Sequence, residues 1–171
     1  MRTRFLIALG ACWALMLANL AIAQQASPQA TASPQSRPEY GATITNEQAR
    51  AVAAAAVAEA KKNNWRMAVA IVGSGGELVY FEKMDGTQLA SADLSQAKAR
   101  TAVLFRLPSK AFADQYAAGN MVFLTFPVQP VASEGGVPIV VNGKLIGAIG
   151  VSGGTGQQDG ATATAGANAA K

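Results

Sequence analysis

The chain has 171 residues, of which 50% are hydrophobic and 14% are charged, and its formal net charge is +4. It has no histidine and one cysteine, Cys12, which excludes imidazole-based general-base catalysis, histidine-ligated zinc or haem, and an internal disulfide. The charged residues are scattered along the chain, so the sequence gives little support for a nucleic-acid partner.

The first 23 residues are typical of a secretory signal peptide. Arg2 and Arg4 form a basic start, residues 5–20 are apolar, and Ala21–Ala23 reads as an A-x-A cleavage site. A lipoprotein signal is the alternative, because the residues up to Cys12 resemble a lipobox. The apolar stretch continues well past that cysteine, so we expect cleavage after the A-x-A site. We also expect no membrane span after processing and a periplasmic or secreted location.

Residues 24–40 are rich in Ala, Gln, Ser and Pro, and we predict that they are a disordered linker. Residues 41–171 are long enough for one domain with its own core. Thr45 and Gln48 predict a capping box at the start of a helix that runs to about Asn63. The apolar face of this helix is predicted to be Ala49, Val52, Ala53, Ala56, Val57 and Ala60.

The next segments predict a first β-hairpin. Residues 66–72 form an apolar strand, the glycine-rich segment 73–76 a turn, and residues 77–83 an alternating return strand. Met84 and Asp85 then begin a second turn, which ends the strand.

A second helix is predicted over residues 91–106, with Ser91 or Asp93 as its cap. Lys98 falls inside the apolar arc of this helix, where an isolated ammonium is costly to bury. Two interpretations stay open: the ammonium reaches solvent or an internal ion pair, or it contacts an anionic ligand near Arg100. The predicted apolar arc is Leu94, Ala97, Thr101, Leu104 and Phe105.

The chain between this helix and residue 134 has weaker signals. Ser109 can cap a short helix that runs to about Ala118, and residues 121–126 can form a short strand or a packed loop. Near the C-terminus, Asp159 is the predicted cap of a helix with poor helix propensity.

A second hairpin is predicted over residues 137–151. Its strands are 137–141 and 144–151, and Asn142 and Gly143 are the signal for a type I′ turn. Strict alternation along the second strand would place Leu145, Gly147, Ile149 and Val151 on one face. The order of helices and hairpins predicts an α+β fold, with an antiparallel sheet of about five strands and helices covering at least one face.

Glycines mark both the ends and the middle of this hairpin. Gly147 and Gly150 are costly inside a strand, so they predict that another element or a ligand approaches the backbone closely. The pairs 135–136 and 153–154 lie at the same end of the hairpin, where they predict a rim rich in backbone donors.

Several of these segments together resemble the GlcG/HbpS family, also called the haem-degrading or DUF336 domain, and the C-terminal domain of PduO proteins. The resemblance covers about residues 44–170. It rests on the segments Met84-Asp85-Gly86, Ala97-Lys98-Ala99-Arg100-Thr101-Ala102, Gly135-Gly136-Val137-Pro138-Ile139, Gly143–Gly154 and Gln158-Asp159. It implies a roadblock- or profilin-like fold, homo-oligomers, and haem binding in some members.

The resemblance and the residues together predict a ligand site. Its predicted members are Met84, Asp85, Lys98, Arg100, Thr101, Glu134, Gly135 and Gly136. Lys98 and Arg100 suit the propionates of haem. Because histidine is absent, the iron ligand stays unknown, with Tyr80, Tyr116 and Thr101 as weak candidates.

Three functions follow from the sequence. The first is an exported protein that binds haem or another tetrapyrrole. The second is an enzyme that acts on haem or on a small organic acid, although the chain offers neither a reactive cysteine nor a spaced carboxylate pair for catalysis. The third is a non-catalytic oligomeric assembly module. Catalytic residues are not assigned.

Overall fold

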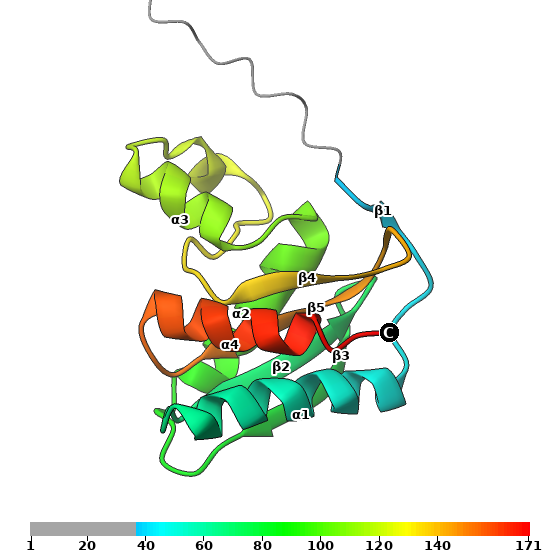
Figure 1. Cartoon of the computed structure of the whole chain (residues 1–171). Helices are drawn as coiled ribbons and strands as arrows, with labels where there is room; N and C mark the ends of the chain where they lie inside the picture. The colour runs from blue at the N-terminus through cyan, green and yellow to red at the C-terminus, as the bar shows by residue number, and fades with distance from the viewer. Residues whose placement is uncertain (1–36) are drawn as a thin grey trace, which may run out of the picture. The chain divides into compact units, whose positions relative to one another are not determined.

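The computed structural model describes residues 37–171 (Figure 1). The predicted signal peptide and nearly all of the predicted linker lie outside these residues. The elements follow in the order β1 (Glu39–Tyr40), α1 (Asn46–Lys62), β2 (Ala68–Gly73), β3 (Leu78–Lys83), α2 (Ser91–Phe105), α3 (Lys110–Ala117), the 3-10 helix η1 (Val122–Thr125), β4 (Gly136–Val141), β5 (Lys144–Ser152) and α4 (Gly156–Ala167). The predicted α+β class is confirmed.

The sheet has five strands and is centred on β5. Both predicted hairpins form: β2 pairs antiparallel with β3, and β4 pairs antiparallel with β5, while β5 also pairs antiparallel with β2. The fifth strand is β1, which pairs in parallel with the start of β5 and comes from the last residues of the predicted linker. Residues 121–126, predicted as a strand or loop, instead contain η1.

A β-bulge changes which face the residues of β5 occupy. The pairing with β4 passes from Gly147 directly to Leu145, so Ile146 is an extra residue in β5. As a result, Leu145 packs in one core cluster with Ala148, and Ile146 packs in the other with Ile149. The predicted grouping of Leu145 with Ile149 was therefore wrong, because it assumed an uninterrupted alternation.

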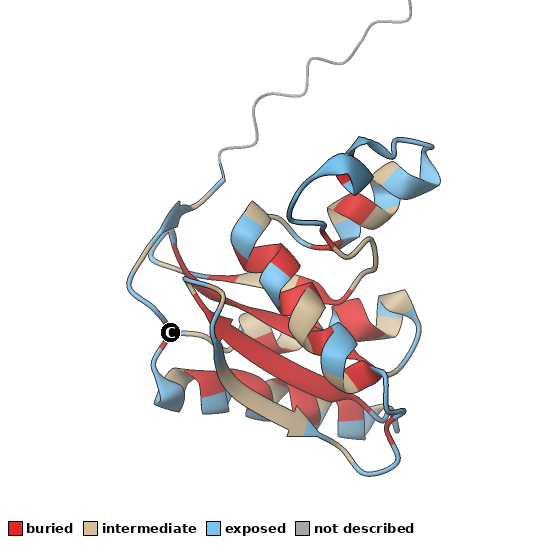
Figure 2. Cartoon of the chain, turned by 180° about the vertical axis from the view of Figure 1, so that it is seen from behind, coloured by how far each residue is buried: buried red, intermediate tan, exposed pale blue. Residues whose placement is uncertain are grey.

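Helices cover both faces of the sheet. Helices α1 and α4 pack side by side on one face, and α2 covers the other (Figure 1). Seen from behind, the buried residues concentrate on the central strands and on the helix surfaces turned toward them (Figure 2). The capping box of Thr45 and Gln48 is present, and all six predicted apolar residues of α1 are buried.

Two predicted helix caps differ from those in the structure, and a third is confirmed in position. The N-cap residue of α2 is Ala90, which has no capping side chain, whereas Ser109 is the N-cap residue of α3 as predicted but makes no side-chain capping hydrogen bond. Helix α4 is capped by Thr155, in a capping box with Gln158, and Asp159 lies within its first turn. The hydroxyl of Ser109 and the carboxylate of Asp159 bind elsewhere, as described below, so neither is available for its own helix.

The buried face of α2 is narrower and smaller than predicted. Leu94 and Leu104 are exposed, whereas Ser95, Ala99 and Ala102 are buried against the sheet. Small side chains are needed there because α2 touches the backbone of β5.

Within residues 37–171, no helix combines the length and apolar character that a membrane span requires.

Candidate functional site

The structure places Lys98 in a buried ion pair between two helices. The Lys98 Nζ on α2 donates to Oδ2 of Asp159 on α4 at 2.7 Å and to the backbone carbonyl of Val151 at 3.2 Å. The side chains of Lys98 and Asp159 are only 3% and 4% exposed. The other carboxylate oxygen of Asp159 accepts a hydrogen bond from the backbone N–H of Gly154 at 2.9 Å. This is the internal ion pair that the sequence analysis left open.

The rim glycines 135 and 136 are required by close packing against this ion pair. An added Cβ on Gly136 would lie 2.2 Å from the backbone oxygen of Lys98, and one on Gly135 would lie 2.9 Å from the Cβ of Asp159. The hydroxyl of Ser109 accepts a hydrogen bond from the N–H of Gly136 at 2.8 Å and donates to Ser133 O at 2.6 Å. The rim therefore seals the ion pair, and the N–H of Gly136 is already bonded.

Burial raises the pKa of the Asp159 carboxyl above its ordinary value of 3.8. The hydrogen bonds from Lys98 and from the N–H of Gly154 oppose this shift, because they favour the charged carboxylate. Lys98 and Asp159 thus form a buried salt bridge, in which hydrogen bonds to the carboxylate offset part of the cost of removing the charges from water.

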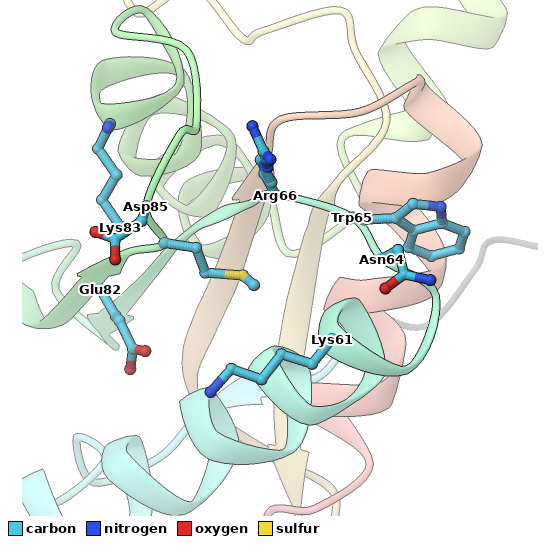
Figure 3. A pocket seen from close by; sticks show the side chains of 8 residues that line it. Lys61, Asn64, Trp65, Arg66, Glu82, Lys83 and Asp85 are labelled. Atoms are coloured by element: carbon cyan, nitrogen blue, oxygen red, sulfur yellow. The ribbon is translucent and has the colours of Figure 1, made fainter.

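A surface groove lies at one end of the sheet, between the C-terminus of α1 and the C-terminus of β3. Its volume is about 600 Å³, and we call it the Arg66 groove. Its lining residues are Lys61, Asn64, Trp65, Arg66, Glu82, Lys83, Met84 and Asp85. In Figure 3, Lys61 enters from α1, while Glu82 and Lys83 come from β3.

A smaller hollow of about 350 Å³ adjoins this groove, and we call it the Thr87 recess. The two hollows share Asn64, Trp65 and Arg66. The recess is also lined by Gly86, Thr87, Gln88, Gly153, Gly154 and Gln158. The second glycine pair of the predicted rim therefore lines an open recess, whereas the first pair covers the buried ion pair.

The predicted site residues do not gather in one place. Met84 and Asp85 line the Arg66 groove. The exposed Arg100 donates from Nε to the backbone oxygen of Gly76 at 3.3 Å, so it lies at the turn of the first hairpin. Glu134 packs over the start of α4, where an added Cβ on Gly160 would lie 2.3 Å from Glu134 Oε1. Lys98 and Arg100, which were predicted to contact one ligand together, instead bind to different parts of the chain.

The three candidate iron ligands differ in availability. Thr101 is buried, and its hydroxyl both donates to Ala97 O and accepts from the N–H of Val131, each at 2.9 Å. The Tyr80 hydroxyl donates to Glu82 at 3.1 Å, and burial raises the pKa of Tyr80, which disfavours a tyrosinate. Tyr116 on α3 is 51% exposed and is the most accessible of the three.

Two kinds of residue were missed by the sequence analysis. Arg66 and Thr87 border hollows that form only when the α1–β2 connection, the turn after β3 and the start of α4 meet. Asp159 was assigned a cap rather than the partner of Lys98, although both residues lie in the segments that carry the family resemblance. Among residues 37–171, no cluster of three or more carboxylate side chains could hold a metal ion.

Most of the described chain is similar to known proteins. Residues 44–168 match the family described as haem degrading protein HbpS-like. Protein GlcG of Escherichia coli K12 is 43% identical over 109 residues, which span 64% of this chain and 81% of GlcG.

Two solved structures share the fold over most of the chain. The crystal structure of protein ORFY from Klebsiella pneumoniae has a TM-score of 0.70 and 28% identity, covering 80% of this chain and 97% of ORFY. The crystal structure of a PduOC–haem complex has a TM-score of 0.68 and 26% identity, covering 74% of this chain and 94% of PduOC. The chain therefore belongs to the HbpS-like family, whose members are described as haem-degrading proteins.

Proposed function

We propose that this protein is exported and binds haem or a related tetrapyrrole. The observation that carries the proposal is its likeness to PduOC, which has been crystallised with haem and matches at a TM-score of 0.68 with 26% identity. The basic and apolar N-terminal segment with its A-x-A site supports export.

We place the haem in the Arg66 groove. Its volume of about 600 Å³ lies in the range of small-molecule and cofactor pockets, about 300–1,000 Å³. Trp65 and Met84 offer apolar surface for a macrocycle, and both also pack against the main core. Lys61, Arg66 and Lys83 surround these two side chains with cationic groups that suit propionate carboxylates.

The groove offers a weak set of iron ligands. Among the described lining residues, Met84 offers a thioether, which is an established axial ligand but a poor match for hard ferric iron, and Lys61 and Lys83 offer amines. Bound haem would supply iron-centred redox chemistry, while the chain itself would bind and orient the macrocycle. We expect ferric haem that is high-spin and is lost readily to a stronger acceptor.

Assembly into homo-oligomers is the second part of the proposal. The segment around α3 and η1 carries a row of exposed apolar side chains, and such a patch suits contact with a second copy of the chain. These side chains are Tyr116, Met121, Val122, Leu124, Phe126 and Val128. Light scattering coupled to size-exclusion chromatography measures the mass of the assembly directly, and a monomer at all concentrations would refute this part.

The identity of the ligand can be tested without assuming what it is. The protein is exported by a host grown with ample haem, purified without added cofactor, and examined by native mass spectrometry for whatever remains bound. A mass increment matching haem or another tetrapyrrole supports the proposal. A different small molecule bound at stoichiometric occupancy would refute haem as the ligand and identify another.

A further inference from the structure

We propose that the Thr87 recess is a binding site for a single carboxylate group. The proposal rests on the residues of this recess alone and does not require haem in the neighbouring groove. Two features of residues 37–171 carry it: a guanidinium that takes part in no ion pair, and a buried hydroxyl that has no hydrogen-bond partner.

The guanidinium of Arg66 is positioned but unused. It lies over Gly86, where an added Cβ would stand 2.7 Å from Nη1 and 3.2 Å from Cζ of Arg66. Within residues 37–171, Arg66 takes part in none of the four ion pairs. A guanidinium is a planar fork of donors that matches a carboxylate with two parallel hydrogen bonds. A glycine at position 86 leaves room for that fork.

The hydroxyl of Thr87 lacks a hydrogen-bond partner. Thr87 is only 5% exposed, and among residues 37–171 its buried Oγ1 finds no hydrogen-bond partner. Buried polar side-chain atoms nearly always have a partner, so an orphan hydroxyl beside a hollow indicates a ligand or a bound water. A threonine hydroxyl can donate to a carboxylate oxygen.

Helix α4 begins at the same recess. Gly154, just before the helix, and Gln158, in its first turn, are lining residues, and the helix is capped by Thr155. The N-terminal end of a helix carries partial positive charge. Here the N–H groups of Gly154, Thr155 and Gln158 already donate to side chains, among them the carboxylate of Asp159, so the helix adjoins the recess without supplying its donors. Glycines at positions 153 and 154 leave room for the side chains of Met67 and Gln158, which an added Cβ would approach to 3.0 Å or less.

The charge of the recess selects the class of anion. Arg66 is the one charged side chain among its lining residues, so a ligand with one negative charge is neutralised. A phosphate group carries about −1.5 to −2 charges at neutral pH and would be left with charge in excess. A singly charged carboxylate is the better match.

Two sources could supply this carboxylate. One is a free small carboxylic acid that fills the recess of about 350 Å³. The other is a propionate arm of a tetrapyrrole seated in the Arg66 groove, since the two hollows share Asn64, Trp65 and Arg66. Both place the same chemical group against Arg66 and Thr87.

The first arm of the test uses sodium acetate and sodium lactate as probes. Backbone amide shifts of Thr87, Gly153 and Gly154 are followed by NMR, with sodium chloride at matched ionic strength as the reference. The shifts should saturate with probe concentration. Arg66→Met and Thr87→Val should each raise the dissociation constant of the probe about tenfold or more, as expected for the loss of a hydrogen bond to a charged group. Thr87→Val should keep or raise the melting temperature, because it removes an unpaired buried hydroxyl.

Two variants serve as controls. Thr162→Val removes the other buried hydroxyl without a partner, which lies outside the recess, and should leave probe affinity unchanged. Lys62→Met removes an exposed cation that lines neither the groove nor the recess, and small carboxylates should bind this variant like the parent protein.

The second arm compares haemin with haem dimethyl ester, which lacks free carboxylates. If the propionate is the source, Arg66→Met weakens haemin but not the ester, and acetate stays silent. If haemin does not bind while acetate binds through Arg66 and Thr87, the haem proposal fails and the carboxylate site stands. The site is refuted if neither probe class depends on Arg66 and Thr87.

Discussion

The ammonium of Lys98 and the carboxylate of Asp159 meet 2.7 Å apart at the end of the central strand, although their helices cover opposite faces of the sheet. Lys98 belongs to α2 and Asp159 to α4, and their contact lies beside Val151 at the end of β5. One buried ion pair thus ties both helical layers to the central strand.

We expect Lys98→Met to destabilise the protein by about 3–5 kcal/mol, because it leaves the buried carboxylate of Asp159 without its counter-charge. Chemical denaturation measures this free energy of unfolding. Arg100→Met on the exposed side of the same helix is the control, and it should change stability by no more than about 0.5 kcal/mol. A Lys98→Met variant as stable as the parent would show that the pair is not structural.

The same pair predicts a dependence on pH. Burial raises the pKa of Asp159 above 3.8, so the folded state binds more protons than the unfolded state between 3.8 and the folded pKa. The free energy of unfolding therefore falls as pH rises through this window. Lys98→Met removes an opposing ammonium and raises this pKa further.

The destabilisation caused by Lys98→Met should consequently be smaller at about pH 4 than at about pH 7, because Asp159 can take up a proton at the lower pH. Denaturation of the parent, Lys98→Met and Lys98→Met/Asp159→Asn proteins at both pH values checks this. The double variant has no carboxyl at position 159, so the gain in stability that Lys98→Met shows between pH 7 and pH 4 should be absent from it. An equal penalty for Lys98→Met at both pH values would contradict a raised pKa.

Gly150→Ala tests the contact between α2 and β5. An added Cβ would lie 1.9 Å from the backbone oxygen of Ser95 and 2.5 Å from the N of Ala99, so the helix must move away. We expect a loss of about 1–3 kcal/mol or more, the scale of overpacking in a core.

Gly75→Ala is the matched control for Gly150→Ala. Its added Cβ would meet only the carboxylate end of Glu77, at 2.9 Å, and that end is flexible. Thermal unfolding of the two variants should therefore separate them clearly. Equal melting temperatures would mean that α2 does not press on β5.

The hairpins and α1 could be predicted because their signals are local. Asn142 and Gly143 have positive φ values of 51° and 75°, as the predicted turn requires. The capping box of Thr45 and Gln48 spans only four positions. The need for glycine at position 150 could also be predicted, since a glycine inside a strand indicates close packing whatever the partner.

Features that depend on distant segments could not be predicted in the same way. The bulge at Ile146 depends on the pairing with β4. The partner of Lys98 is 61 residues away along the chain, and the place of Lys98 in an apolar arc predicts only that its ammonium needs solvent, a partner or a ligand. Arg66 looked like the first residue of a strand, and its place between two hollows depends on β3 and α4 as well.

The export proposal predicts a mature chain that starts at Gln24, after the A-x-A site at Ala21–Ala23. Intact mass spectrometry of the protein recovered outside the cytoplasm measures this directly. A species that starts at Cys12 and carries a diacylglyceryl group would contradict it and favour the lipoprotein alternative.

If haem binds in the Arg66 groove, its affinity should depend on the lysines that line the groove. Lys61→Met combined with Lys83→Met should weaken haemin binding about 2- to 30-fold, because exposed charge pairs contribute about 0.2–1 kcal/mol each. Lys110→Met on α3 removes an exposed lysine that pairs with Asp114 and does not line the groove, so it should leave haemin affinity unchanged. Added salt should weaken haemin binding to the parent protein but affect the double variant less.

Titration of the purified protein with haemin, followed by electron paramagnetic resonance, tests the central claim most directly. We predict saturable binding and a high-spin ferric spectrum, because the chain has no histidine to bind the iron and the groove offers only weak ligands. A low-spin spectrum with two nitrogen ligands would contradict the ligand argument. The absence of any saturable binding would refute haem as the ligand.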